Sequence, residues 1–388
     1  MRVAFISQHD PQDVKSWSGL CHFMWHALMQ QKVEVELIGP LPLPLHRRTS
    51  NWLKRNFYSR LHGQLYWQDG DVDNAIAWSQ AAGRRLQALP PVDAVLSATA
   101  LPTAFLPGKV PLITYADATM RSLFESYPDH ARMPAFSRRD AELIEGAAHV
   151  RASALIYASQ WAANSAVQDY GVDARKVHVV PFGANLAVAP TSQEVIGAIA
   201  SRDSAILRLV FIGREWERKG GPLAVAVTRQ LNQLGCPARL TIIGATPKLS
   251  PAEAEWVTQL GFIEKNADGQ ARIHAELARS HFLLVPSQAE CFGLVYCEAS
   301  AYGVPSIAKD VGGVSSAVRN GRNGQLFGPQ AGAQEIAAWI KEKTTSPLAY
   351  QTLACAARAE FEAELNWQVA GSRLVTIIKQ VVNKVAAH

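Results

Sequence analysis

The chain has few cysteines and no long apolar run, and less than a fifth of its residues carry charge. Its five cysteines, at positions 21, 236, 291, 297 and 355, form no Cys-x-x-Cys pair and no metal-ligand spacing, which favours free thiols. No stretch reaches the roughly 18 apolar residues that a membrane-spanning helix needs. The start, "MRVAFIS", enters a strand with no leader, so we expect a cytoplasmic protein that can touch the inner face of a membrane peripherally.

Two further absences narrow the function. No Gly-x-Gly-x-x-Gly follows the first strand, where "QHDPQDVKSWSG" stands, and this argues against a dinucleotide-dependent oxidoreductase. No Asp-x-Asp pair stands at a convincing strand end, so we expect neither a metal nor another cofactor. The net charge of +5 favours anionic ligands or an anionic membrane surface but is no nucleic-acid signature, so no nucleic-acid partner is expected.

The length and the residue pattern predict two α/β domains. At 388 residues, with 48% hydrophobic residues, the chain exceeds one ordinary core. Short apolar runs alternate with turns and amphipathic segments, which predicts doubly wound parallel sheets with helices on both faces. The expected strands are 2–7, 33–39, 94–97, 112–115, 154–158, 177–180, 207–213, 239–244, 281–286 and 305–308.

The predicted domain boundaries follow the change in composition. Residues 1–185 form the first Rossmann-like domain, and 206–367 form the second. Between them, Pro, Gly and Ser in 181–205 break the alternation of strands and helices, and we expect 186–205 to be a linker. The segment 368–388 carries apolar residues at helical spacing, and we expect it to be a closing helix that completes the first domain.

The stretch "LVPSQAECFGLVYCEASAYGVPSIAKDVGGVSSAVRNG" (284–321) predicts a ligand site. A strand ends at a Pro turn, Glu290 follows, and a helix is expected over 292–302 with Glu298 inside it. At ~1.5 Å per residue the two carboxylates lie on the order of 10 Å apart along the axis. Carboxylates suit sugar hydroxyls, and a helix N-terminus approached closely at Gly293 suits phosphate, so the spacing fits a nucleotide-sugar. An ordinary strand–loop–helix remains the alternative.

Three other loops fit the same ligand. "FIGREWERKGG" offers Arg214 and Lys219, which suit phosphate oxygens, although surface cations are usually just solvated. "SWSGLCHF" opens a helix in the first domain. In "DVGGVSSAVRNGRNG", Gly312 and Gly313 would let the backbone approach the ligand, with ordinary turn chemistry as the alternative.

Together with "YASQWAANSAVQDYGVDARKVHVVPFGAN", these motifs resemble the family-4 retaining glycosyltransferases of GT-B fold, densely over 153–327 and more loosely over the first forty residues. The resemblance implies two Rossmann-like domains that face each other across a cleft, and metal-independent transfer of a hexose-type sugar. The donor is a nucleotide-diphosphate sugar, with a UDP-sugar favoured and GDP-mannose the alternative. The acceptor is a hydroxyl of a saccharide, a lipid-linked molecule or a small molecule. An epimerase or phosphorylase of the same fold, and a catalytically silent nucleotide-sugar-binding protein, remain alternatives.

The resemblance also assigns residues. Glu290 would hold the donor sugar, and Glu298 the ribose; Arg214 and Lys219 would clamp the diphosphate. Asp117, in "ITYADATM", stands where many relatives carry a His, and it is either catalytic or a turn or cap residue. The other expected donor contacts are Gly19, Gly213, Gly244, Phe262, Ile263 and the backbone of Phe292, Gly293 and Leu294.

The segment "HRRTSNWLKRNFYSRLHGQLYW" (46–67) mixes five Arg and Lys residues with aromatics. One interpretation is an interfacial helix or loop that meets anionic lipid or an anionic acceptor. The other is a solvated basic face with its aromatics turned inward. We expect 122–140, near Asp117, to help line the acceptor side.

Overall fold

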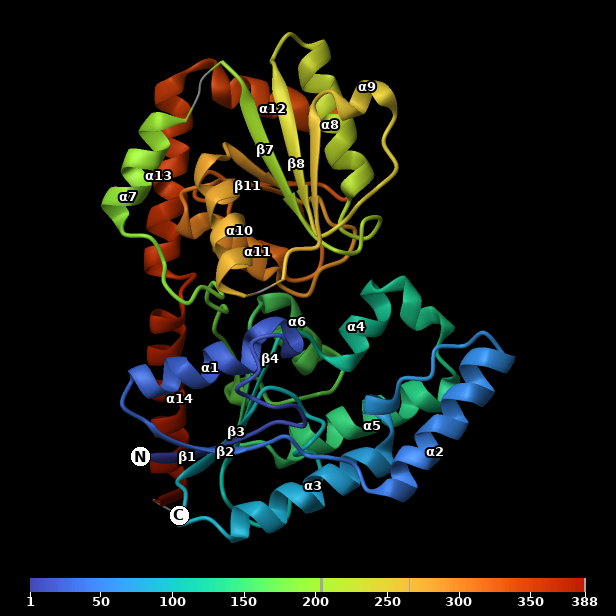
Figure 1. The fold of residues 1–388 in the computed structure, drawn as a ribbon. Coiled ribbons are helices and arrows are strands. Elements are labelled where there is room, and N and C mark those ends of the chain that lie inside the picture. Colours follow the sequence, from blue (N-terminus) through green and yellow to red (C-terminus); the bar gives the residue numbers. More distant parts are fainter. Residues whose placement is uncertain (203–204, 265, 387–388) are drawn as a thin grey trace. The chain divides into compact units, whose positions relative to one another are not determined.

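The structure, a computed structural model, describes residues 1–202, 205–264 and 266–386. The chain divides into two compact units, Met1–Pro181 with Trp367–His388, and Phe182–Asn366. Each unit contains a six-stranded parallel sheet with helices packed on it (Figure 1). The predicted doubly wound α/β class is therefore confirmed. Among the described residues, no helix is long and apolar enough to cross a membrane.

The first sheet has the strand order β2-β1-β3-β4-β5-β6, with parallel pairing throughout. All six of its strands coincide with predicted apolar runs. The four strands between the edge strands are almost fully buried, as expected for central strands of a parallel sheet. The strands are β1 (Arg2–Ile6), β2 (Glu34–Ile38), β3 (Ala94–Ser97), β4 (Leu112–Ala116), β5 (Ala154–Tyr157) and β6 (Val177–Val179).

Helices and shorter helical turns complete the first unit. The predicted closing helix forms as α14 and contacts α1, where Gly371 lies against the backbone of Ala27; residues 387–388 of that prediction lie outside the described residues. The helices are α1 (Leu20–Gln30), α2 (Leu45–Arg55), α3 (Val72–Gln87), α4 (Met120–Ser126), α5 (Ala135–Arg151), α6 (Gln160–Gln168) and α14 (Trp367–Ala386). The shorter turns are η1 (Ser16–Gly19), η2 (Asn56–Leu61), η3 (Gln68–Gly70), η4 (Pro128–Arg132) and η5 (Ala174–Lys176).

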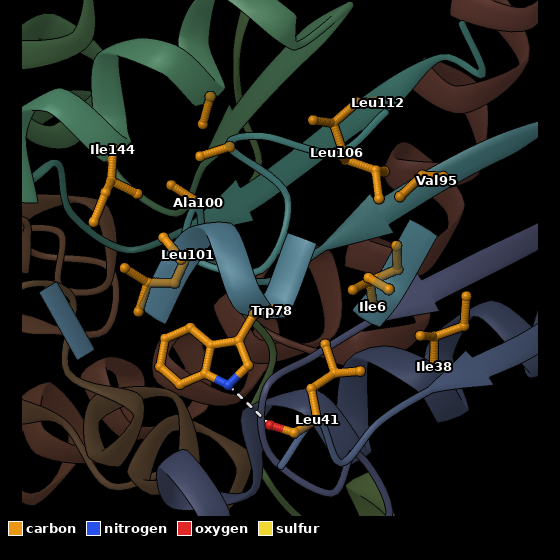
Figure 2. Packing of buried hydrophobic residues seen from close by; sticks show 14 of the residues in the cluster. Ile6, Ile38, Leu41, Trp78, Val95, Ala100, Leu101, Leu106, Leu112 and Ile144 are labelled. Carbon is orange, nitrogen blue, oxygen red and sulfur yellow. Dashed lines mark hydrogen bonds between the residues drawn. The ribbon is translucent and has the colours of Figure 1, made fainter. Parts of the chain in front are cut away.

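A core cluster around Trp78 joins α3 to the first sheet (Figure 2). The indole packs among residues from β1, β3 and the loop after β3, including Ile6 and Leu101. Its Nε1 donates a hydrogen bond of 2.8 Å to the carbonyl of Leu41, so the one polar atom of the ring is satisfied within the apolar cluster.

The second sheet has the order β12-β11-β10-β7-β8-β9 and is also parallel. The sequence predicted β7 (Leu207–Ile212), β8 (Ala238–Ile243), β10 (Phe282–Leu284) and β11 (Ser306–Lys309). It missed β9 (Val257–Gly261) and β12 (Gly324–Phe327). Polar residues and glycine interrupt both strands, which read "VTQLG" and "GQLF", so they lack the apolar run that identified the others.

The segment predicted as a linker is largely helical. Within 186–205, α7 (Ser192–Ser201) forms behind a capping box in which Thr191 and Glu194 satisfy each other's backbone N–H groups. Because α7 buries Val195 and Ile199, it belongs to the second unit, and the linker prediction is wrong there; residues 203–204 lie outside the described part of the chain. The remaining helical elements are α8 (Gly221–Gln233), α9 (Pro251–Ala254), α10 (Ala267–Arg279), α11 (Leu294–Ala301), η6 (Val314–Ser316), α12 (Ala333–Thr345) and α13 (Pro347–Ala363).

Candidate functional site

The strand order of the second sheet locates the candidate site. From β7 the chain builds the sheet outward through β8 and β9, and from β10 it builds in the opposite direction through β11 and β12. Strands β7 and β10 are neighbours, so the direction of winding reverses between them. Ligands of doubly wound sheets bind beyond the carboxyl ends of the strands at such a switch point. The loops 213–220 and 285–293, which follow these two strands, therefore form the site.

Hydrogen bonds tie these two loops together. The backbone N–H of Gln288 donates to the carbonyl of Arg218 at 2.7 Å. In return, Nη1 of Arg218 donates to the carbonyl of Ala289, also at 2.7 Å. The backbone on either side of the switch point is thus fixed before any ligand arrives.

A buried carboxylate lies where the loops meet. Glu290 accepts a hydrogen bond from the ammonium of Lys219 and forms an ion pair with it. Both residues were predicted for the site. Nη1 of Arg218 lies 3.9 Å from Oε2 of Glu290, and Oγ of Ser287 lies 3.5 Å from it. A buried carboxylate is costly without partners, and this cluster of opposite charge supplies them to Glu290.

The sequence prediction named Arg214 for this cluster and missed Arg218. The available signal was the position of Arg218 beside Lys219 in "ERKGG". Its Nε also donates to Oε2 of Glu215 at 2.5 Å, and this hydrogen bond lowers the pKa of the Glu215 carboxyl. Arg218 is therefore held from two sides, by Glu215 and by the Glu290 loop.

The Gly-Gly pair also reaches Glu290. The N–H of Gly313 donates to the backbone carbonyl of Glu290 at 3.1 Å. Gly312 has a φ of 54°, and a Cβ there would lie 2.1 Å from the same carbonyl oxygen. Only glycine permits this approach, so the prediction that Gly312 and Gly313 lie close to the site has a steric basis.

Helix α11 begins at Leu294, two residues later than expected. Gly293 is its N-cap, with a left-handed φ of 89°, and a Cβ there would lie 2.4 Å from the Tyr296 ring. Phe292 packs its side chain edge-on against Phe182 at a centroid distance of 5.4 Å, so only its backbone is available to a ligand. The first turn of the helix still follows the switch-point loop directly, as a phosphate site requires.

Glu298 lies within α11 and is half-buried. The neighbouring side chain of Cys297 is buried, and burial together with the charge of Glu298 raises the pKa of its thiol well above its usual range. Cys297 is therefore a neutral core residue, and the polar chemistry of this part of the helix comes from Glu298.

The remaining predicted donor contacts cluster after β8 and β9. The N–H of Gly244 donates to the carbonyl of Gly261 at 2.7 Å, and the N–H of Gly213 donates to the carbonyl of Ile243 at 2.9 Å. The guanidinium of Arg214 lies 4.8 Å from the centre of the Phe262 ring. Phe262 is 62% exposed, whereas Ile263 is buried, so of these two side chains Phe262 is the one that presents a flat apolar surface to a ligand.

The first unit holds Asp117 and Gly19 at strand ends of its own sheet. Asp117 directly follows β4 and is half-buried. The N-cap of α4 is Thr119, which forms a capping box with Ser122, so the alternative role of Asp117 as a helix cap is wrong. Gly19 ends η1, the turn after β1, in which Trp17, Ser18 and Gly19 all have positive φ values of 45°, 58° and 86°.

Comparison with known families covers most of the chain. Residues 22–188 match the family described as "Glycosyltransferase Family 4", and residues 207–343 match the family described as "Glycosyl transferases group 1".

Among curated relatives, the D-inositol 3-phosphate glycosyltransferase of Gordonia bronchialis is 31% identical over 193 residues, which are 46% of this chain and 42% of the relative. The glycogen synthase of Mycobacterium tuberculosis is 30% identical over 164 residues, which are 41% of this chain and 39% of the relative. The chain thus spans less than half the length of these two relatives.

Solved structures show the same architecture over the full chain. The sucrose-phosphate synthase of Thermosynechococcus elongatus aligns with a TM-score of 0.68 at 18% identity, covering 100% of both chains. Anabaena HepE in complex with UDP-glucose aligns with a TM-score of 0.59 at 18% identity, again covering 100% of both chains. With two doubly wound units, a charged switch-point site and two matching family profiles, the chain belongs to the family-4 glycosyltransferases of GT-B fold.

Proposed function

We propose that this protein is a retaining glycosyltransferase that moves a hexose-type sugar from a nucleotide-diphosphate sugar, a UDP-sugar, to a hydroxyl acceptor. The observation that carries the proposal is the Lys219–Glu290 pair at the switch point of the second sheet, with Arg218 beside it. A cation and a carboxylate in contact match the two halves of such a donor, because phosphate needs cations and sugar hydroxyls need strong acceptors. The complex of Anabaena HepE with UDP-glucose supports the uridine nucleotide.

In the proposed complex, each part of the donor meets a different group. The diphosphate lies at the N-terminus of α11, near Gly293 and Leu294, with Lys219, Arg218 and Arg214 as cations. Glu290 accepts hydrogen bonds from the sugar hydroxyls, and Glu298 accepts them from the ribose. The base stacks on the exposed ring of Phe262, whose other neighbour is the Arg214 guanidinium.

The proposed chemistry depends on stabilising the leaving group. As the bond from the anomeric carbon to the phosphate oxygen breaks, negative charge grows on the diphosphate and positive charge grows on the sugar. The negative charge on the diphosphate is stabilised by Lys219, Arg218 and the backbone amides at Gly293 and Leu294, because these groups are already fixed in place. The positive charge on the sugar is stabilised by the carboxylate of Glu290. The acceptor oxygen attacks from the face that the diphosphate leaves, and a diphosphate oxygen takes its proton, so the configuration is retained and no metal takes part.

On the acceptor side, we propose that Asp117 and Gly19 contribute from the first unit. Asp117 would orient the acceptor hydroxyl, and Gly19 stays a predicted ligand contact of the first unit. The acceptor is a hydroxyl of a saccharide or of a lipid-linked or small molecule, and the names of the relatives, which include an inositol-phosphate glycosyltransferase, support this range. The expected cytoplasmic location stays a prediction.

A thermal-shift panel of UDP, GDP, ADP and TDP, each free and as its sugar conjugate, tests the donor. A ligand that binds only the folded protein raises its melting temperature, and we expect the uridine compounds to give the largest rise. Glu298→Ala should abolish that rise. Glu342→Ala, which removes an exposed carboxylate on α12, is the matched control and should leave the rise unchanged.

The same samples test turnover. Incubation with UDP-glucose should release UDP, and NMR of any glycoside formed should show the α configuration of the donor. A uridine-dependent rise without UDP release would identify a silent binding protein, and a β-linked product would contradict retention. A rise that survives Glu298→Ala would refute the ribose assignment alone.

A further inference from the structure

A helical segment in the first unit combines exposed apolar side chains with exposed arginines. Helix α2 (Leu45–Arg55) continues into the π-helical turn η2 (Asn56–Leu61), within the connection from β2 to β3. Figure 1 shows α2 along the margin of the first unit. Residues 45–65 contain no Asp or Glu, so the segment carries charge of one sign. The contacts of the segment show which of its side chains face the protein.

One face of α2 is fixed to the first unit by ion pairs. Arg47 donates to Oδ1 of Asp71 at 2.6 Å and to Oδ2 of Asp73 at 2.7 Å, and Lys54 donates to Oδ2 of Asp71 at 2.5 Å. Although burial opposes it, the hydrogen bonds from Lys54 and Tyr66 lower the pKa of Asp71. Two of the five basic residues in the segment therefore hold the helix in place rather than serving an external ligand.

The opposite face carries large apolar side chains in solvent. Leu45 and Trp52 are seven residues apart, nearly two helical turns, and so project in almost the same direction, with Leu53 beside Trp52. Phe57 and Leu61 continue the exposed apolar set through η2. The exposed fractions are 76% for Leu45, 55% for Trp52, 56% for Leu53, 49% for Phe57 and 73% for Leu61.

Arginines flank this apolar face. Arg48 and Arg55 are also seven residues apart, and both are exposed, as is Arg60 in η2. None of the three makes an ion pair with a residue that the structure describes, in contrast to Arg47 and Lys54. The adjoining turn η4 (Pro128–Arg132) adds the exposed Arg132, whose Nη2 donates to Gly63 at 2.9 Å, and one exposed acid, Asp129. The surface is therefore basic around an apolar centre.

The two interpretations of 46–67 thus apply to different residues. Tyr66 is buried, and Tyr58 stacks against it at 6.3 Å and packs on Phe136 at 5.0 Å, so these aromatics face inward. Trp52 and Phe57 face solvent. The segment alone could not show which aromatics face inward, because Asp71 and Asp73, which fix its inward face, lie outside it.

We propose that the exposed face of α2 and η2 docks on an anionic lipid surface. The apolar side chains enter the interface between headgroups and acyl chains, and Arg48, Arg55 and Arg60 contact lipid phosphates. Stable peripheral binding takes two signals, an apolar contact and a basic patch, and this face supplies both on one rigidly held helix. The occupant is a membrane rather than a polyanion in solution, because a polyanion gives no reason to expose five large apolar side chains.

Vesicle flotation of the full chain tests the proposal without any donor or acceptor, so its outcome is independent of the proposed transfer reaction. We expect flotation with vesicles of phosphatidylcholine and phosphatidylglycerol and little with phosphatidylcholine alone. Arg48→Glu/Arg55→Glu should weaken binding by at least about 30-fold, since each basic residue near an anionic surface contributes about fivefold. Trp52→Ser/Leu53→Ser should weaken it by about tenfold or more, through loss of the apolar contact.

Matched controls distinguish a local effect from a general one. Arg84→Glu/Arg85→Glu on α3 makes the same charge change at exposed positions elsewhere, and Leu348→Ser removes an apolar side chain that is 72% exposed. Both should bind as the parent does, and all variants should melt at the parental temperature.

Equal binding of parent and α2 variants would overturn the proposal, as would binding that ignores lipid charge. A concentration-dependent dimer that Trp52→Ser/Leu53→Ser dissociates would show instead that a second copy covers this face.

Discussion

The two sheets have the same number of strands and the same parallel pairing, but their carboxylates at the switch point are used differently. In the first unit, Asp10 and Asp13 follow β1 and accept hydrogen bonds from the N–H groups of Gln12 and Lys15, two residues further on, at 2.9 Å each. In the second unit, Glu290 pairs with Lys219, 71 residues away along the chain. The first arrangement shapes one exposed loop, whereas the second joins two loops around a buried charge.

This difference indicates which half of the molecule is built for a charged ligand. An exposed aspartate that closes its own turn costs little and leaves nothing for a ligand to exchange. A buried carboxylate held by two cations offers partners for both the phosphate and the hydroxyl groups of one molecule. We infer that recognition of the donor is concentrated in the second unit.

Glu290→Gln should have the largest effect. It keeps the shape of the side chain but removes the charge that stabilises the sugar in the proposed transition state, so, if the proposal holds, UDP release from UDP-glucose should fall by about 10³-fold. The melting-temperature rise caused by UDP should persist, because the phosphate ligands remain. Glu276→Gln is the control, since Glu276 is also a buried carboxylate of the second unit paired with an arginine, Arg279. If both variants lose activity equally, Glu290 is structural.

Two glycine substitutions distinguish the cost in stability of close packing from that of backbone strain. Gly312→Ala places a Cβ against the carbonyl of Glu290 at a residue that also has positive φ, so it should destabilise the protein by about 3 kcal/mol. Gly321→Ala is a matched control, since its φ is 72° but no atom lies within 4 Å of the added Cβ, and it should cost about 1 kcal/mol. Denaturant unfolding measures both. Equal costs would show that the contact between Gly312 and Glu290 is loose in solution.

Much of the fold could be predicted from the sequence, because buried parallel strands read as apolar runs between turn residues. The edge strands β9 and β12 were missed because polar residues and glycine interrupt them in "VTQLG" and "GQLF". Helix α7 was missed for another reason, because the Pro, Gly and Ser residues within 181–205 suggested a linker, although Thr191 and Glu194 form a capping box. In a single sequence, a change in composition is easier to recognise than a helix cap.

The site was predictable to the extent that it depends on local sequence. Lys219, Glu290 and the Gly312–Gly313 pair are brought together as expected, because strand order places their loops at one edge of the sheet. Arg218 could not be chosen over Arg214 from the sequence, because both are arginines in one loop. Which of them points at Glu290 depends on the hydrogen bonds to Ala289 and Gln288, which belong to a distant segment.

Asp117→Asn tests whether the first unit contributes to the reaction. Because Thr119 rather than Asp117 caps α4, the variant should keep the cap of this helix. If Asp117 orients a reacting hydroxyl, UDP release in the presence of an acceptor should fall by about 10²-fold, while the UDP-induced rise in melting temperature stays constant. Thr119→Ala is the complementary variant, which should lower stability by about 1 kcal/mol through loss of the cap. A variant of Asp117 that is fully active would confine the chemistry to the second unit.

Phe262→Ala should have the smallest effect and tests the edge of the donor site. The ring is 62% exposed and lies against the Arg214 guanidinium, so its removal takes away a stacking surface without opening the core. We expect uridine nucleotides to bind about tenfold more weakly, since one base–aromatic stack contributes about 1–3 kcal/mol. Phe262→Tyr retains the flat surface and should bind as the parent does. Calorimetric titration of UDP measures both affinities. If Phe262→Ala binds UDP normally, the base lies elsewhere, and the contact between Phe262 and Arg214 only orders the loop after β9.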